Sequence, residues 1–331
     1  MNDENKMLPT GITVGQLIKL RSLVQKYIDC QQAREDFENR IRSIKDEVAP
    51  DCELGFIVEN TLTEGVDMQP RPMTKSGKQA KTVFGLRRFE SAIKKEIEDI
   101  VEGHRFYTEW TANVKGLGIW LTAELIAFLE SYWAELEIVI RKKKMERGQK
   151  LDKEETITKK LYPPKSRSSL SHLCGYINRN CEKCGLPSEQ CQCEDKEESI
   201  GRAYRLTKGQ KAVGNPRLKA LMYVIHGSAL KQQGKLYDVW KKEHEEIIRK
   251  YPQYLKQNYG AETREECKKL FKGYIPNTLD LSRRYFIKVF LSLVWEKYQE
   301  LYRLPIPPPQ HCRGVPLSNK DWIHPKDVEN D

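Results

Sequence analysis

The chain has 331 residues, with 57 lysine and arginine residues against 47 aspartate and glutamate residues, and its formal net charge is +10 at pH 7. Apolar residues make up 39% of the sequence, and no apolar run approaches the ~20 residues that a membrane-spanning helix needs. The first six residues also lack the apolar core of a signal peptide. We therefore expect a cytoplasmic protein of two or three domains, with no membrane partner.

The positive charge is concentrated in two segments. Residues 141–167 carry a net charge of +7 and residues 201–250 a net charge of +8, whereas the rest of the chain sums to −5. Acidic residues interleave with the bases of the first segment, a pattern that also fits an ordinary solvated surface. Residues 202–219 instead hold six bases and no acid. Such a cluster favours a polyanionic partner, and nucleic acid is the simplest one.

The amino-terminal third has the pattern of a helical arm. Residues 1–12 are predicted to form a loose tail, and apolar residues then recur at steps of three or four from Val14 to about Ile44. This spacing predicts a long amphipathic helix, one arm of a coiled coil that can pair two protomers. A glycine- and proline-containing flexible loop is expected at 60–84, and a second helix at 86–101 that returns antiparallel to the first. We assign residues 1–105 to this arm.

A glycine-containing bend follows in the sequence VKGLGIWLTAEL, residues 114–125. Gly116 and Gly118 flank one apolar residue, so a helix can end, turn tightly and restart within a few residues. This is the pattern of a helix-hairpin-helix, which we expect over 106–140. Backbone N–H groups at the restarted helix suit a phosphate oxygen, and Lys115 adds a positive charge beside them. The alternative is a glycine turn between two packed helices.

A basic linker is expected at 141–165, followed by a helical domain at 166–304 that contains a cysteine cluster. Cys181-x-x-Cys184-Gly185 precedes Cys191-x-Cys193. The glycine lets backbone N–H groups approach thiolate sulfur, and four thiolates fit tetrahedral zinc without an open coordination position. We therefore predict a structural zinc knuckle. The alternative is four free cysteines.

The residues after the knuckle contain the acid-free basic cluster. Asn215-Pro216 predicts a helix start, with asparagine as the N-cap and proline at the first helical position. His226 is expected to be an ordinary helix histidine. Further helices are predicted at 235–258 and 280–302, the second with a packed aromatic stripe, before a polar tail at 305–331. The predicted nucleic-acid contacts are Lys115, Gly116, Gly118, Arg202, Arg205, Lys208, Lys211, Asn215, Arg217 and Lys219.

In this order the motifs resemble the carboxy-terminal half of insertion-sequence transposases that join a RuvC-like DEDD nuclease domain to a helical, serine-bearing transposase domain. Lys115 stands where that family usually has proline. The resemblance covers most of residues 14–302, and GNPRLKALMY is its most specific part. The matching stretches are LRSLVQKYIDCQQAREDFENRIRSI, VKGLGIWLTAELIAFL, LSHLCGY, GQKAVGNPRLKALMYVIHGSAL and SRRYFIKVFLSLVWEKY.

The resemblance implies a mostly α-helical, transposase-like protein that takes part in DNA transposition and recombination within a mobile element. DNA is the implied partner, and structured RNA is a second one. The first hundred residues show no strand with a catalytic aspartate, so magnesium is not expected from this chain alone and a RuvC-like partner would supply the nuclease. The nucleophilic serine of the family aligns by position with Ser199. Here Ser199-Ile200-Gly201 replaces the family's Ser-Gly, and the alternative is an exposed loop serine.

Three hypotheses follow from these patterns. The leading one is a transposition-related nucleic-acid-binding protein without its own nuclease domain. The second is an enzyme, a strand transferase that acts through Ser199 with a nuclease domain supplied in trans. The third is a structural or regulatory module in which the zinc knuckle and the coiled coil build a protein-interaction platform.

Overall fold

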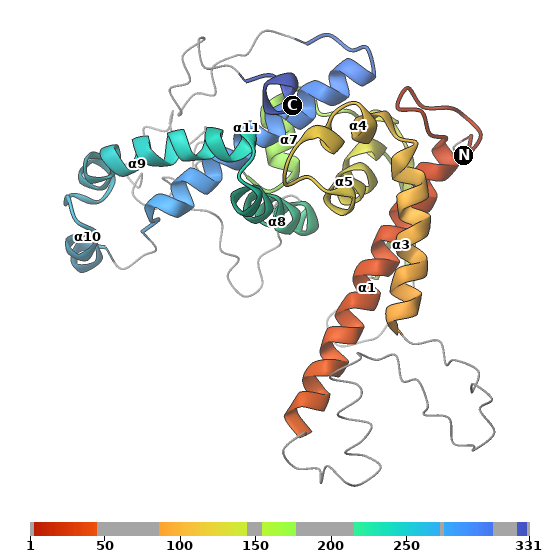
Figure 1. Cartoon of the computed structure of the whole chain (residues 1–331), viewed down its shortest axis with the longest axis horizontal. Helices are drawn as coiled ribbons and strands as arrows, with labels where there is room; N and C mark the ends of the chain where they lie inside the picture. Colours follow the sequence, from red (N-terminus) through yellow and green to blue (C-terminus); the bar gives the residue numbers. More distant parts are fainter. Residues whose placement is uncertain are drawn as a thin grey trace. The chain divides into compact units, whose positions relative to one another are not determined.

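The computed structural model describes six stretches, which are residues 3–44, 86–143, 154–176, 215–271, 275–306 and 323–329. They are mostly helical, as predicted, with one two-stranded sheet (Figure 1). They belong to two compact units. The smaller unit comprises Asp3–Met7 and Ile12–Gly103, and the larger comprises Leu8–Gly11 and the chain from His104 onward.

The smaller unit is built on two helices, α1 (Val14–Ile44) and α3 (Leu86–Glu102), which lie side by side (Figure 1). Two ion pairs join them in opposite order along the two helices, Lys19 to Glu96 at 2.9 Å and Arg34 to Glu90 at 2.7 Å. This order confirms the antiparallel return. The coiled coil itself stays a prediction. The apolar seam is formed by Leu17, Leu20, Val24, Ile93, Ile97 and Val101, all buried.

Residues 8–12, just before α1, are packed in part, so the prediction of a loose tail is wrong for them. Leu8, Thr10 and Ile12 are buried, and Gly11 turns the chain with φ +90°. In the larger unit, the Thr10 carbonyl accepts a hydrogen bond of 2.8 Å from the backbone N–H of Arg105.

The larger unit begins with a run of short helices on both sides of the glycine bend. Beyond the bend, three segments follow one another without a break, one of them a π-turn. The helices are α4 (Arg105–Thr108), η2 (Thr111–Asn113), α5 (Ile119–Leu125), η3 (Ile126–Glu130) and α6 (Ser131–Trp133).

A β-hairpin follows where the sequence predicted more helix and then a basic linker. Strand β1 (Glu137–Lys143) pairs antiparallel with β2 (Glu154–Lys160), with Ile140 opposite Ile157. Glu135 ends the helical run with φ +52°. The two strands contain β-branched residues, which favour extended backbone over helix. The helix therefore stops at Trp133, and part of the predicted linker is sheet.

The carboxy-terminal part of the larger unit is arranged around α11. This helix contacts α4, α7, α8, α9 and η6. Its aromatic stripe packs as predicted: Tyr298 stacks on Phe106 and on Trp133, with ring centroids 4.5 Å apart in both pairs. The helices are α7 (Arg167–Leu173), α8 (Pro216–Gln232), α9 (Lys235–Tyr259), α10 (Arg264–Leu270), α11 (Thr278–Leu301) and η6 (Pro325–Val328).

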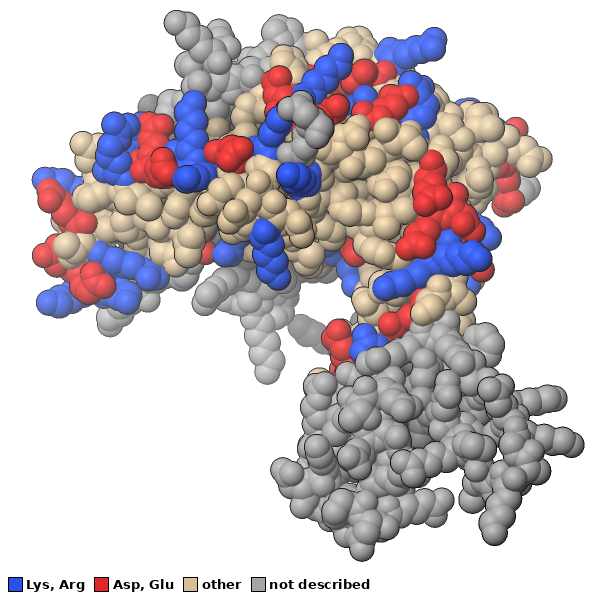
Figure 2. All heavy atoms as spheres, in the orientation of Figure 1, with Lys and Arg blue, Asp and Glu red and all other residues tan. Residues whose placement is uncertain are grey.

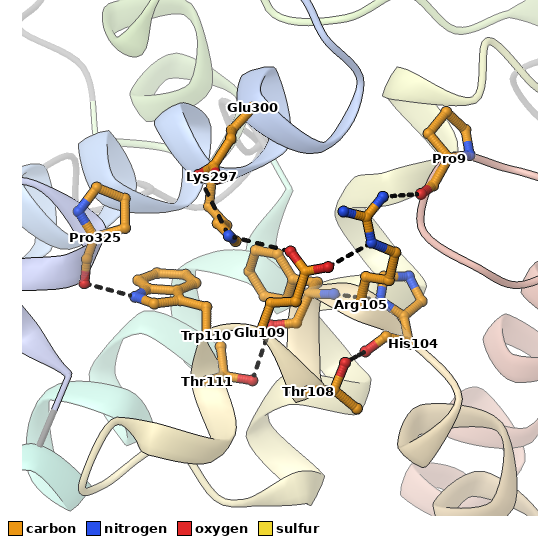
Figure 3. Close-up of polar contacts among 11 residues, drawn as sticks. Pro9, His104, Arg105, Thr108, Glu109, Trp110, Thr111, Lys297, Glu300 and Pro325 are labelled. Carbon is orange, nitrogen blue, oxygen red and sulfur yellow. Dashed lines mark hydrogen bonds and ion pairs between the residues drawn. The ribbon is translucent and has the colours of Figure 1, made fainter. Parts of the chain in front are cut away.

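Polar contacts join distant segments of the larger unit (Figure 3). The Glu109 carboxylate accepts from Arg105 Nε at 2.5 Å and from Lys297 Nζ at 3.5 Å. The indole of Trp110 donates to the Pro325 carbonyl at 3.0 Å. Pro325 and Val328 are buried. The polar tail predicted at 305–331 therefore includes a packed segment at 323–329.

Glu130, whose carboxylate is fully buried, forms a second group of polar contacts in the larger unit. It contacts His104 Nε2 and accepts hydrogen bonds from Thr10 Oγ1 and, at 3.0 Å, from the Tyr302 hydroxyl. His104 Nδ1 accepts from the Phe106 backbone N–H, which leaves the proton on Nε2 for Glu130. Burial, and then the charge of Glu130, raise the pKa of Tyr302. The Glu130 carboxylate has hydrogen-bond partners on both oxygens and no solvent exposure, so we assign it a structural role rather than a binding role.

Candidate nucleic-acid interface

The structure describes six of the residues predicted to bind nucleic acid. They are Lys115, Gly116, Gly118, Asn215, Arg217 and Lys219. The other predicted site residues lie outside the described stretches, and their roles stay predictions. These are Cys181, Cys184, Cys191, Cys193, Ser199, Arg202, Arg205, Lys208 and Lys211.

Helix α8 begins as predicted. Asn215 is its N-cap, and the side-chain oxygen accepts from the backbone N–H groups of Arg217 at 3.0 Å and Leu218 at 3.5 Å. Pro216 occupies the first helical position, where its missing N–H is not needed. The amide of Asn215 is thus engaged in capping, which gives this predicted contact residue a structural role.

The glycine bend packs against the other end of α8. Gly116 has φ +96°, and a Cβ placed on it would lie 2.9 Å from Ala229 Cα. This close approach explains why glycine stands at 116 and gives Gly116 a structural role rather than a contact with nucleic acid. Gly118 and Lys115 stay exposed. Because Ala229 is twelve residues beyond Arg217, the bend lies about 18 Å along α8 from the basic end of that helix. The bend and the first turn of α8 therefore do not form one phosphate site.

Arg217 and Lys219 lie on opposite flanks of α8, because residues two apart are rotated by about 200° around a helix. Arg217 lies on the flank near Glu124 of α5. Burial raises the pKa of the Glu124 carboxyl, and the Arg217 guanidinium partly offsets that rise. On the other flank, burial and then the charge of Arg284 lower the pKa of Lys219. The two bases border the exposed face of the helix from either side.

The exposed face between these flanks carries no acidic side chain, since α8 has none in its sequence. Tyr223 and Val224 are 40% and 56% exposed on it. A Cβ on Gly227 would have no described atom within 4 Å, so this part of the face is open. The opposite face supplies the predicted core residues Leu218, Leu221, Met222 and Ile225, all buried.

Two arginines of α11 and one tyrosine add to this face, and the sequence analysis missed all three. Arg283 lies over the Tyr223 ring, with its guanidinium carbon 5.2 Å from the centroid. Arg284 lies near Lys219, as the effect on the lysine pKa indicates. The Tyr176 hydroxyl donates to the Lys219 carbonyl at 3.2 Å. Two adjacent arginines near the start of a largely apolar helix are the sequence feature that could have predicted this part of the face. We call the exposed side of α8, with Arg283, Arg284 and Tyr176, the α8 face.

The bases of α9 behave differently. The four acidic residues of 201–250 all lie in this helix, so the preceding 201–234 segment has seven bases and no acid. Glu246 pairs with Lys250 at 2.5 Å and with Arg249 at 3.5 Å. Figure 2 shows acidic and basic side chains interleaved over α9 and α10. This part of the predicted basic segment is an ordinary solvated surface.

No metal site occurs within the described residues, where no group of three or more His, Cys, Asp or Glu side chains is placed to hold an ion. The four cysteines predicted to bind zinc lie outside the described residues. Among the same described residues, no helix has the length and apolar character needed to cross a membrane.

Comparison with known proteins gives no relative: no protein family, no curated protein and no solved structure matches the chain. The resemblance to insertion-sequence transposases therefore stays a prediction from the sequence motifs. The function of the α8 face has to be argued from its own chemistry.

Proposed function

We propose that this chain is a nucleic-acid-binding protein with a role in DNA transposition, and that the α8 face contacts the sugar–phosphate backbone. The supporting observation is the charge of that face. Helix α8 carries Arg217, Lys219 and Lys231 and no acid, and Arg283 and Arg284 of α11 lie beside it. The role in transposition follows from the sequence resemblance.

The physical argument is the gain from pairing these cations with phosphates. Lys219 and Arg284 are like charges on neighbouring helices: burial, and then the charge of Arg284, lower the pKa of Lys219. A phosphate chain neutralises both and releases its own condensed counterions. Affinity from such contacts depends strongly on salt and little on sequence. With six phosphates neutralised, log K should fall against log salt with a slope of roughly −5 on duplex DNA.

The test measures binding of the full chain to labelled DNA and RNA by fluorescence anisotropy between roughly 50 and 200 mM salt. The double variant Arg217→Gln/Lys219→Gln should weaken binding and make the salt slope shallower by about two. The matched control is Arg249→Gln/Lys250→Gln, which removes the same charge from α9, where acids interleave. We expect affinity close to that of the unchanged protein for this control. Absence of binding at low salt, or equal loss in both double variants, refutes the proposal.

Two further proposals rest on the sequence alone. Zinc bound by Cys181, Cys184, Cys191 and Cys193 would brace the segment that leads into the α8 face. A strand-transfer reaction through Ser199 would need a base or metal from another subunit to activate the hydroxyl. It predicts a covalent protein–DNA adduct that Ser199→Ala abolishes when a nuclease partner is present.

A further inference from the structure

Tyr223 is an exposed aromatic residue in the middle of the α8 face. Its side chain is 40% exposed, although α8 has a well-packed apolar side that the ring does not join. Burial therefore explains only part of its presence. A large planar side chain on a surface rich in bases is a common arrangement for stacking on nucleobases.

The Tyr223 ring is held in place by its neighbours. The guanidinium of Arg283 lies 5.2 Å from the ring centroid, and the Tyr176 ring centroid is 6.3 Å away with the two rings inclined at 47°. Tyr176 is itself fixed, because its hydroxyl donates to the Lys219 carbonyl and Gly175 turns the chain after α7 with φ +77°. A ring fixed before binding loses little conformational freedom when a planar ligand lies on it.

Positively charged side chains lie near this ring. The Arg283 guanidinium lies over one face of the ring, and its Nη1 atom is 3.7 Å from Asp280 Oδ1. Lys219 and Arg284 lie together on the same flank. A base on the ring would therefore place its own phosphate beside positive charge. An apolar peptide would gain nothing from these cations, so the chemistry favours a nucleotide.

We infer that Tyr223 stacks on an unpaired nucleobase, and that the α8 face therefore binds single-stranded DNA or RNA segments in preference to a duplex. This inference rests on the proposed function and names the form of nucleic acid that the same face takes. Bases inside a duplex are covered on both faces by their neighbours, so they offer the ring no surface. A single strand, a loop or a bulge exposes that surface.

The experiment compares the full chain with Tyr223→Ala and Tyr223→Phe on three probes at one low salt concentration. The probes are a thymidine homopolymer, a uridine homopolymer and a blunt DNA duplex. Removal of the ring should weaken binding to the single strands by about tenfold and leave duplex binding within about twofold. Tyr223→Phe keeps the aromatic face and should bind like the unchanged protein.

The control is Tyr162→Ala. Tyr162 is 63% exposed and also has a cation over its ring, Lys160 Nζ at 5.6 Å from the centroid. That lysine, however, is paired with Glu135 at 3.0 Å. Loss of this ring should leave all three affinities unchanged. Thermal unfolding of each variant verifies that the fold is retained, and Tyr223→Leu, which fills space without an aromatic ring, replaces the alanine variant if alanine unfolds the protein.

The outcomes separate the two proposals. If Tyr223→Ala binds single strands as well as the unchanged protein, or weakens all probes equally, stacking is refuted while phosphate binding by the α8 face stands. If the unchanged protein binds none of the probes at low salt, the proposed function is refuted, and stacking with it. The DNA and RNA homopolymers reveal which polymer supplies the base.

Discussion

Replacing Gly116 by alanine tests the explanation of the glycine bend. At φ +96° an alanine side chain is strained, which costs roughly 1–2 kcal/mol. The new Cβ would also stand 2.9 Å from Ala229 Cα, a backbone atom of α8 that cannot rotate away. Forcing an extra methyl group into such a contact costs about 1–3 kcal/mol. The reduced freedom of the unfolded chain offsets about 0.4–1 kcal/mol. The midpoints of these ranges give an expected net loss of about 3 kcal/mol.

Gly118→Ala is the matched control, two residues away in the same bend. Gly118 has φ −63°, and no described atom lies within 4 Å of the position of its Cβ. Alanine is a poorer N-cap for α5 than glycine by roughly 0.5–1 kcal/mol, and the reduced freedom of the unfolded chain offsets about the same amount. We expect no net change. The two variants thus share one chemical change and differ in the backbone φ of the site and in what the added methyl group meets.

The assay is thermal unfolding followed by circular dichroism, with guanidinium unfolding as the second measurement. A unit of this size loses about 2–4 °C per kcal/mol, so Gly116→Ala should melt about 5–15 °C lower. Gly118→Ala should melt with the unchanged protein. If both variants melt alike, contact with α8 does not explain Gly116. If Gly116→Ala keeps its stability and loses nucleic-acid affinity instead, the bend is a binding element after all.

Two more predictions concern pH and metal. Burial, and then the charge of Arg283, lower the pKa of His226 from 6.5 to about 4. Between these two pH values the unfolded chain binds a proton at His226 that the folded protein does not. The free energy of unfolding should therefore fall as the pH drops from 6.5 toward 4. His226→Leu should flatten that part of the stability curve, and an unchanged pH dependence would contradict the assignment. Elemental analysis of the purified chain should find about one zinc per molecule, absent from Cys181→Ser/Cys184→Ser. A metal-free protein that keeps its fold would exclude the knuckle.

Features set by a few neighbouring residues could be predicted from the sequence. Asn215 and Pro216 start α8 because a capping side chain and a fixed φ act within one turn. The apolar spacing of α1 and α11 predicts their buried sides for the same local reason. The pairing of β1 with β2 was not predicted from the sequence. The apolar spacing of the preceding helix continues to Ile140, but the positive φ of Glu135 ends the helix earlier.

The tertiary structure alone decided which distant residues meet. Position 116 has no room for a side chain, because the backbone of Ala229, more than a hundred residues further along the chain, lies against it. Tyr176 follows α7, Lys219 lies in α8 and Arg283 in α11, and only the packing of these segments places the three residues on one face. Periodicity tells which side of a helix is buried, but the identity of its partner depends on how all the helices pack together.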